Sequence, residues 1–174
     1  MVSHAYGEVL TGVRELSSLP PLYEDENPDL EYVPPGEAGT AAPYTAHDGL
    51  ATAGVYSCVG VRIGSVEDGM EFLTHTRPGD VENGRNPFLE EFLDTLDSSG
   101  ESFEVEVTYA VARTVDEGSS PDSTRELLRA SRKSLDDVDS IKVSEETVTV
   151  QQPPASLAIK PDDDTIYSYV RREV

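Results

Sequence analysis

Hydrophobic and polar residues alternate over residues 54–63, GVYSCVGVRI, a pattern typical of a β-strand. Successive side chains of a strand point to opposite faces. The two predicted sets are Val59, Val61 and Ile63 on one face, and Cys58, Gly60 and Arg62 on the other. Shorter or similar patterns predict further strands at 5–13, 70–75, 102–112 and 140–150, and a C-terminal hairpin over 156–172.

Two stretches have helical periodicity instead. In residues 86–100, Asn86 is a predicted N-cap and Pro87 suits the first helical position. Its apolar stripe consists of Phe88, Leu89, Phe92, Leu93 and Leu96. A second helix is predicted over 119–135, with a narrower stripe of Leu127, Leu128, Ser131 and Leu135. Two main helices among many strands predict an α/β fold, a layered sandwich with a mixed, mostly antiparallel sheet.

The length of 174 residues predicts a single domain, 1–174. Residues 17–48 contain many prolines and show little periodicity. We therefore interpret them as an irregular Pro-rich arm or surface excursion and not as a linker between two domains.

The net charge is the most unusual feature of the composition. The chain has 34 acidic and 13 basic residues, which gives a net charge of −21, and the acids are spread along the whole sequence. Such a charge repels itself at low ionic strength, whereas molar salt shortens the Debye length to about 3 Å. The sequence therefore predicts a salt-adapted protein, as in haloarchaea, that loses structure when it is desalted.

The same charge argues against nucleic acid and anionic membrane surfaces as partners, since both require clustered basic residues. No apolar run approaches the roughly 20 residues of a membrane-spanning helix, and the first ten residues do not resemble a secretory signal. One cysteine allows no internal disulfide. We expect a cytoplasmic protein without membrane insertion.

Standard cofactor and metal motifs are absent from the sequence. There is no phosphate-binding loop, no dinucleotide fingerprint and no H-E-x-x-H zinc motif, and a single cysteine excludes a multi-cysteine zinc site. The acidic stretch 161–165, PDDDT, lacks the ligand spacing of a calcium loop and is interpreted as a solvated turn. We expect no metal and no organic cofactor.

Cys58 and His75 are the residues best suited to chemistry. A cysteine hydrolase needs a thiol nucleophile, a histidine that accepts its proton and a third group that orients the histidine. The alternatives are that Cys58 is a small buried hydrophobic residue and that His75 is a solvated residue at a strand end. Spacing alone does not decide between these readings.

The segment Thr52–Val61, TAGVYSCVGV, resembles the T-x-G-x-G-S-C-V-x-V motif of the CheD family of chemoreceptor glutamine deamidases. In that family the catalytic threonine precedes the cysteine by six residues and the histidine follows it by 17, and Thr52, Cys58 and His75 have these separations. The order of predicted elements over 50–170 is also similar. The resemblance implies a CheD-like core at 50–170 with a three-layer α/β/α-type sandwich, related to the deamidase domain of cytotoxic necrotizing factors.

The resemblance implies a role for each matching residue. Cys58 would attack a glutamine side chain of a protein substrate, such as a chemoreceptor or another signalling protein, His75 would transfer the proton and Thr52 would orient His75. Ser57 matches the family and would shape the site together with Tyr56, which stands where the family usually has glycine. Two alternatives stay open: a non-catalytic CheD-like binding module whose pocket Tyr56 has altered, and a halophilic domain of unknown role.

Overall fold

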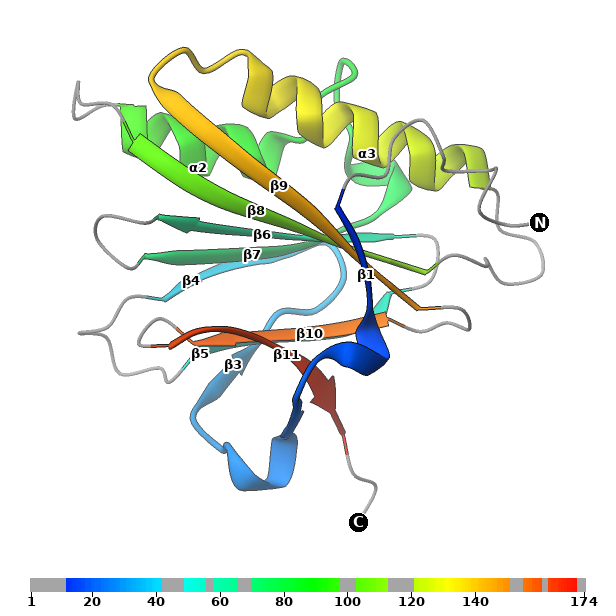
Figure 1. Cartoon of the computed structure of the whole chain (residues 1–174). Coiled ribbons are helices and arrows are strands. Elements are labelled where there is room, and N and C mark those ends of the chain that lie inside the picture. The colour runs from blue at the N-terminus through cyan, green and yellow to red at the C-terminus, as the bar shows by residue number, and fades with distance from the viewer. Residues whose placement is uncertain are drawn as a thin grey trace.

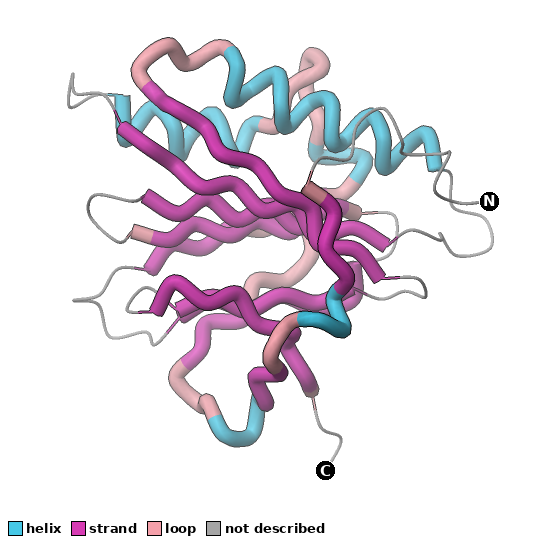
Figure 2. Tube along the Cα trace, in the orientation of Figure 1, coloured by secondary structure: helices cyan, strands magenta, loops and turns pink. Residues whose placement is uncertain are grey.

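The computed structural model describes residues 12–41, 49–55, 58–65, 70–97, 103–112, 121–150, 155–160 and 163–171. Two β-sheets lie face to face, and both described helices cover the outer face of one of them (Figures 1 and 2). The layers therefore follow the order helices, six-stranded sheet, five-stranded sheet. The predicted α/β sandwich is confirmed, but the second face of the six-stranded sheet meets another sheet where an α/β/α arrangement would have helices.

The six-stranded sheet has the order β1-β9-β8-β6-β7-β4. Its strands are β1 (Val13–Glu15), β9 (Ile141–Val150), β8 (Phe103–Ala112), β6 (Val59–Ser65), β7 (Glu71–Thr76) and β4 (Ala38–Ala41). The pairings of β6 with β7 and β8 and of β4 with β7 are antiparallel, whereas β9 is parallel to both β8 and β1. The sheet is thus mixed, as the sequence predicted.

The five-stranded sheet has the order β2-β11-β10-β5-β3. Its strands are β2 (Pro21–Tyr23), β11 (Asp163–Val170), β10 (Ala155–Lys160), β5 (Gly49–Val55) and β3 (Leu30–Tyr32). The hairpin of β10 and β11 confirms the predicted C-terminal hairpin. β5 pairs antiparallel with β10, and this pairing places Thr52 opposite Leu157.

The helices form where the apolar stripes predicted them. They are α2 (Pro87–Asp97) and α3 (Pro121–Asp136). The backbone N–H of Phe88 donates to Asn86 Oδ1 at 3.2 Å, so Asn86 caps α2 as expected. The buried stripes meet the apolar face of β6 and β8 in one core; its helical members are Leu89, Phe92, Leu93, Leu127, Leu128 and Leu135. Burial of these side chains holds the helices on the sheet.

A second core fills the space between the sheets. It includes Leu50, Leu73, Ala110, Leu157 and Ile159. Side chains of β5 and β7 at alternate positions point into this space, and among them are polar residues as well as apolar ones. The candidate site lies at one end of this layer.

Segment 17–48 does more than form an irregular arm. It contributes β2 and β3 to the five-stranded sheet and β4 to the six-stranded sheet. The 3-10 turn Leu16–Ser18 lies between β1 and β2, and the 3-10 turn Glu24–Glu26 lies between β2 and β3. Strands of three or four residues are too short to show a hydrophobic period, which is why the sequence indicated no structure here. Of the strand expected at 5–13, only the last two residues are described, and β1 begins at Val13.

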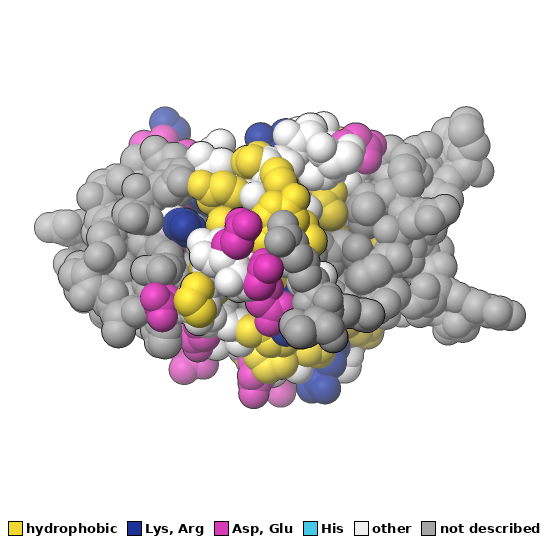
Figure 3. Space-filling view, turned by 90° about the horizontal axis from the view of Figure 1, so that it is seen from below, with side chains coloured by type: hydrophobic (Ala, Val, Ile, Leu, Met, Phe, Trp, Pro, Cys, Tyr) yellow, Lys and Arg dark blue, Asp and Glu magenta, His cyan; other side chains and the backbone are white. Residues whose placement is uncertain are grey.

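The outer face of the five-stranded sheet carries apolar side chains that gather near the middle of the described surface when the molecule is seen from below (Figure 3). Leu22, Ala51, Ala158 and Tyr169 are buried there beneath partly buried Leu30, Tyr32, Ala53 and Tyr167. The guanidinium carbon of Arg171 lies 3.9 Å from the Tyr32 ring centre. No helix in the described ranges is long and apolar enough to cross a membrane.

Candidate functional site

Thr52 and His75 meet between the two sheets. Thr52 lies in β5 of the five-stranded sheet, and His75 lies in β7 of the six-stranded sheet. Their side chains are fully buried, and Thr52 Oγ1 is 2.9 Å from His75 Nδ1. This burial shows that the interpretation of His75 as a solvated strand-end residue is wrong.

The hydrogen bonds of Thr52 define the protonation of the imidazole. The Thr52 hydroxyl donates its only proton to the carbonyl oxygen of Val33, at 2.8 Å. It must therefore accept a hydrogen bond from His75, so Nδ1 carries the proton. In the neutral ring Nε2 then holds a lone pair, and within the described part of the chain this buried atom has no hydrogen-bond partner. The arrangement presents a free base.

His75 is neutral at physiological pH. Its pKa is lowered to about 4, mainly because burial would strip the imidazolium of its hydration and also because of the positive charge of Arg77, while Asp80 acts in the opposite direction. The hydrogen bond to Thr52 involves no charged partner. A neutral imidazole with its proton on Nδ1 can accept a second proton at Nε2 during a reaction.

Cys58 lies at the same end of the β6–β7 ladder. The single strand predicted at 54–63 is in fact two: β5 ends at Val55, β6 begins at Val59, and Cys58 directly precedes β6. Gly60 is opposite His75 in the ladder. Cys58 therefore comes two residues before the residue opposite His75, directly before the strand begins.

Cys58 is partly exposed and is not a fully buried core residue. Burial of its thiol raises the pKa, and the negative charge of Asp80 raises it further, while Arg77 acts in the opposite direction. At neutral pH the resting site therefore contains a protonated thiol and a neutral imidazole. This differs from sites in which a neighbouring cation stabilises a thiolate.

A short turn after β7 supplies the nearest charges. In the 3-10 turn Pro78–Asp80, Arg77 and Asp80 form a two-point ion pair, with Nε to Oδ2 at 3.2 Å and Nη2 to Oδ1 at 3.0 Å. The guanidinium lies against Gly36, where an added Cβ would come within 2.6 Å of Arg77 Cζ. Gly36 also has φ +80°, a conformation that favours glycine. The turn is thus fixed beside the site.

Segment 17–48 forms one wall of the site through its backbone. The Val33 carbonyl accepts from Thr52, the Glu37 carbonyl accepts from the His75 N–H at 3.1 Å, and the Gly36 N–H donates to the His75 carbonyl at 2.8 Å. Backbone groups carry no side-chain signature, so sequence reasoning missed this contribution. It also missed Arg77 and Asp80, although the Pro-Gly-Asp sequence at 78–80 is typical of a turn.

The structure brings together two of the predicted site residues, Thr52 and His75, and places Cys58 at the same end of the strands. Ser57 and Tyr56, the predicted site-shaping residues, lie outside the described residues, as do residues 161–162 of the acidic turn. Within the described ranges no three His, Cys, Asp or Glu side chains are grouped as a metal site would require. No protein-family model and no curated protein matches the chain.

Proposed function

We propose that the chain is a CheD-like cysteine amidohydrolase that deamidates glutamine side chains of a protein substrate to glutamate. The observation that carries the proposal is the hydrogen bond between Thr52 Oγ1 and His75 Nδ1, which leaves Nε2 as an unpartnered base within the described structure. This is the function that the resemblance assigns to a threonine at this position. A chemoreceptor or another chemotaxis signalling protein in the cytoplasm is the substrate class that the resemblance suggests.

The reaction would begin with transfer of the Cys58 thiol proton to His75 Nε2 while Sγ attacks the carboxamide carbon. Collapse of the tetrahedral intermediate breaks the C–N bond, and the imidazolium donates its proton to the departing ammonia. His75 Nε2 then deprotonates a water molecule, which attacks the thioester carbon and breaks the C–S bond. The imidazolium returns this proton to the departing Cys58 thiolate. Atoms and charge balance without a metal or an organic cofactor.

The pKa directions favour a general-base mechanism over a preformed ion pair. Burial raises the pKa of the Cys58 thiol and lowers that of His75 to about 4, so neither group is charged at rest. Proton transfer must accompany the attack. Thr52 acts as a positioning residue, because it fixes the tautomer that leaves Nε2 able to accept the proton.

The first experiment compares wild type with Cys58→Ser and His75→Gln in molar KCl. Ammonia release from a glutamine-rich protein is followed together with mass-spectrometric detection of glutamate. Loss of the general base is expected to lower the rate by about 10²–10⁴-fold in His75→Gln, and Cys58→Ser should be inactive. Activity that survives both substitutions would overturn the proposal.

Alkylation by iodoacetamide tests the state of the thiol without assuming a substrate. Because Cys58 is partly exposed, the folded protein should react, and the midpoint of its pH–rate curve should lie above the ordinary thiol pKa of about 8.5. A thiol that reacts only after unfolding would favour the second candidate, a non-catalytic CheD-like binding module. The raised pKa of Cys58 is the observation that keeps this alternative in view.

A further inference from the structure

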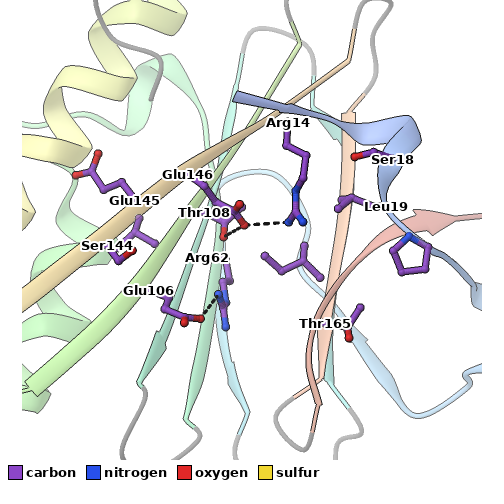
Figure 4. A pocket seen from close by; sticks show the side chains of 13 residues that line it. Arg14, Ser18, Leu19, Arg62, Glu106, Thr108, Ser144, Glu145, Glu146 and Thr165 are labelled. Atoms are coloured by element: carbon purple, nitrogen blue, oxygen red, sulfur yellow. Dashed lines mark hydrogen bonds and ion pairs between the residues drawn. The ribbon is translucent and has the colours of Figure 1, made fainter. Parts of the chain in front are cut away.

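A cleft of about 570 Å³ opens between the sheets away from the Cys58 site. It is lined by β6, β8, β9 and the edge strand β1 of one sheet, by β11 of the other sheet and by the turn that follows β1, and its lining is largely polar (Figure 4). The inner face of a sandwich normally carries apolar side chains. Here Glu106, Thr108, Ser144 and Glu146 occupy it instead.

Arg62 forms the floor of this cleft. Its side chain is 5% exposed, and its Nε and Nη2 atoms donate to Glu71 at 2.8 and 2.7 Å. The remaining nitrogen, Nη1, points to Glu106 at 3.4 Å. Glu71 therefore holds one edge of the guanidinium, and the other edge meets a carboxylate whose side chain is 53% exposed and free to move into solvent.

Arg14 reaches into the cleft from β1 (Figure 4). Its Nη2 donates to Glu146 Oε1 at 3.0 Å, and Thr108 Oγ1 contacts the same oxygen at 3.5 Å. Two arginines and three glutamates thus border the cleft, and one of these glutamates, Glu145, is paired with Arg132. Charges of both signs are available there, each within a pair that has at least one partly exposed member.

We propose that this cleft binds a small zwitterion of the α-amino acid class. Its carboxylate would lie against Arg62 Nη1 and Arg14, and its ammonium against Glu106 and Glu146. A simple anion would face these glutamates and the net charge of −21, and a simple cation would face two guanidinium groups. A zwitterion replaces both ion pairs at once without adding net charge. The cleft volume lies within the range of small-molecule sites, about 300–1,000 Å³.

The test is calorimetric titration of the full chain in molar KCl with L-alanine, which has no carboxamide for Cys58 to attack. Acetate and methylammonium supply each charge alone. Glu106→Gln and Arg14→Gln remove one partner each from partly exposed positions. Glu104→Gln is the matched control, since Glu104 lies on the same face of β8 but outside the cleft lining.

L-alanine should bind, and each cleft substitution should weaken it by about tenfold or more, as expected for a charged hydrogen bond. Glu104→Gln should leave the affinity unchanged. Binding of acetate or methylammonium as tight as that of L-alanine would overturn the proposal that the cleft binds a zwitterion. So would equal weakening in the control, or no binding at millimolar L-alanine to protein shown to be folded by circular dichroism. None of these binding results depends on whether Cys58 is catalytic.

Discussion

Two buried polar pairs lie in the layer between the two sheets, and they differ in charge. Arg62 and Glu71 form an ion pair, whereas His75 and Thr52 form a neutral hydrogen-bonded pair. Burial lowers the pKa of Arg62, but the hydrogen bonds and the charge of Glu71 outweigh it and the pKa is raised. Burial of His75 meets no such compensation, and its pKa falls to about 4.

The comparison shows that this layer keeps a charge only where a neighbouring strand supplies the opposite one. A guanidinium does not lose its proton in proteins, so it must be paired when buried. An imidazole can become neutral instead. The same buried layer therefore contains an ion pair under the cleft and a neutral imidazole near Cys58.

Removing the compensating charge should have the largest effect. Glu71→Gln leaves the Arg62 guanidinium buried without its two-point partner, and breaking such a pair costs about 3–5 kcal/mol. The free energy of unfolding, measured with urea in molar KCl, reports the loss. Glu106→Gln is the matched control: because Glu106 is 53% exposed, its loss should cost less than about 1 kcal/mol. Equal losses would contradict the comparison.

Protonation of the neutral pair, His75 and Thr52, should have the second-largest effect on stability. The pKa of His75 is about 4 in the folded protein and 6.5 ordinarily, so the unfolded state takes up the proton first. The contribution of His75 to stability is complete above pH 6.5 and is lost as the pH falls to 4. Each pKa unit corresponds to about 1.4 kcal/mol, so roughly 3 kcal/mol should disappear across this window.

The measurement is the difference in unfolding free energy between wild type and His75→Gln at several pH values in molar KCl. Subtracting the variant removes the common effect of protonating many carboxylates. The difference should fall with decreasing pH only between 6.5 and about 4. A difference that stays constant would show that His75 is not a buried neutral base.

A methyl group added beside the ion pair of Arg62 and Glu71 should have a smaller effect on stability. A Cβ at Gly64 would lie 2.7 Å from Arg62 Cζ and 3.0 Å from Glu71 Oε2, so Gly64→Ala must displace the pair. Overpacking of this kind costs about 1–3 kcal/mol. Gly79→Ala is the control, because no atom lies within 4 Å of its added Cβ. A thermal unfolding midpoint lowered only by Gly64→Ala is expected, and a similar decrease in both would count against the packing argument.

Sequence reasoning succeeded where a residue pattern repeats over several turns or strand positions. The helices α2 and α3 were predicted from their apolar stripes, and the strands β7, β8 and β9 from their composition and alternation. The strand β6 was predicted only in part, because the predicted strand 54–63 joined the end of β5 to β6. The short strands β2, β3 and β4 were not predicted, because they join the sheets through backbone hydrogen bonds that leave no side-chain period. Tertiary pairing alone reveals them.

The candidate site likewise combines features that side chains reveal in the sequence with features that only the fold reveals. Thr52, Cys58 and His75 were singled out by the resemblance to the CheD motif, and the structure has a hydrogen bond between Thr52 and His75. The Val33 carbonyl, which determines the tautomer of His75, could not be found, because any residue has a carbonyl. The pairing of Arg62 with Glu71 was also missed, since alternation places Arg62 on the inner face but does not identify its partner across the ladder.

The smallest expected effect on stability tests the tautomer itself. Thr52→Val keeps the shape of the side chain but leaves the Val33 carbonyl and the His75 Nδ1–H without their partner, a loss of about 1–3 kcal/mol. Thr52→Ser retains the hydroxyl and should therefore keep most of the stability that Thr52→Val loses. Nitrogen chemical shifts of His75, measured by NMR, report which ring nitrogen carries the proton. In wild type and Thr52→Ser this should be Nδ1, whereas in Thr52→Val the Nε2–H form should gain population. A purely structural role for Thr52 would lower stability without changing this balance, so an unaltered tautomer in Thr52→Val would remove the argument for a positioned base.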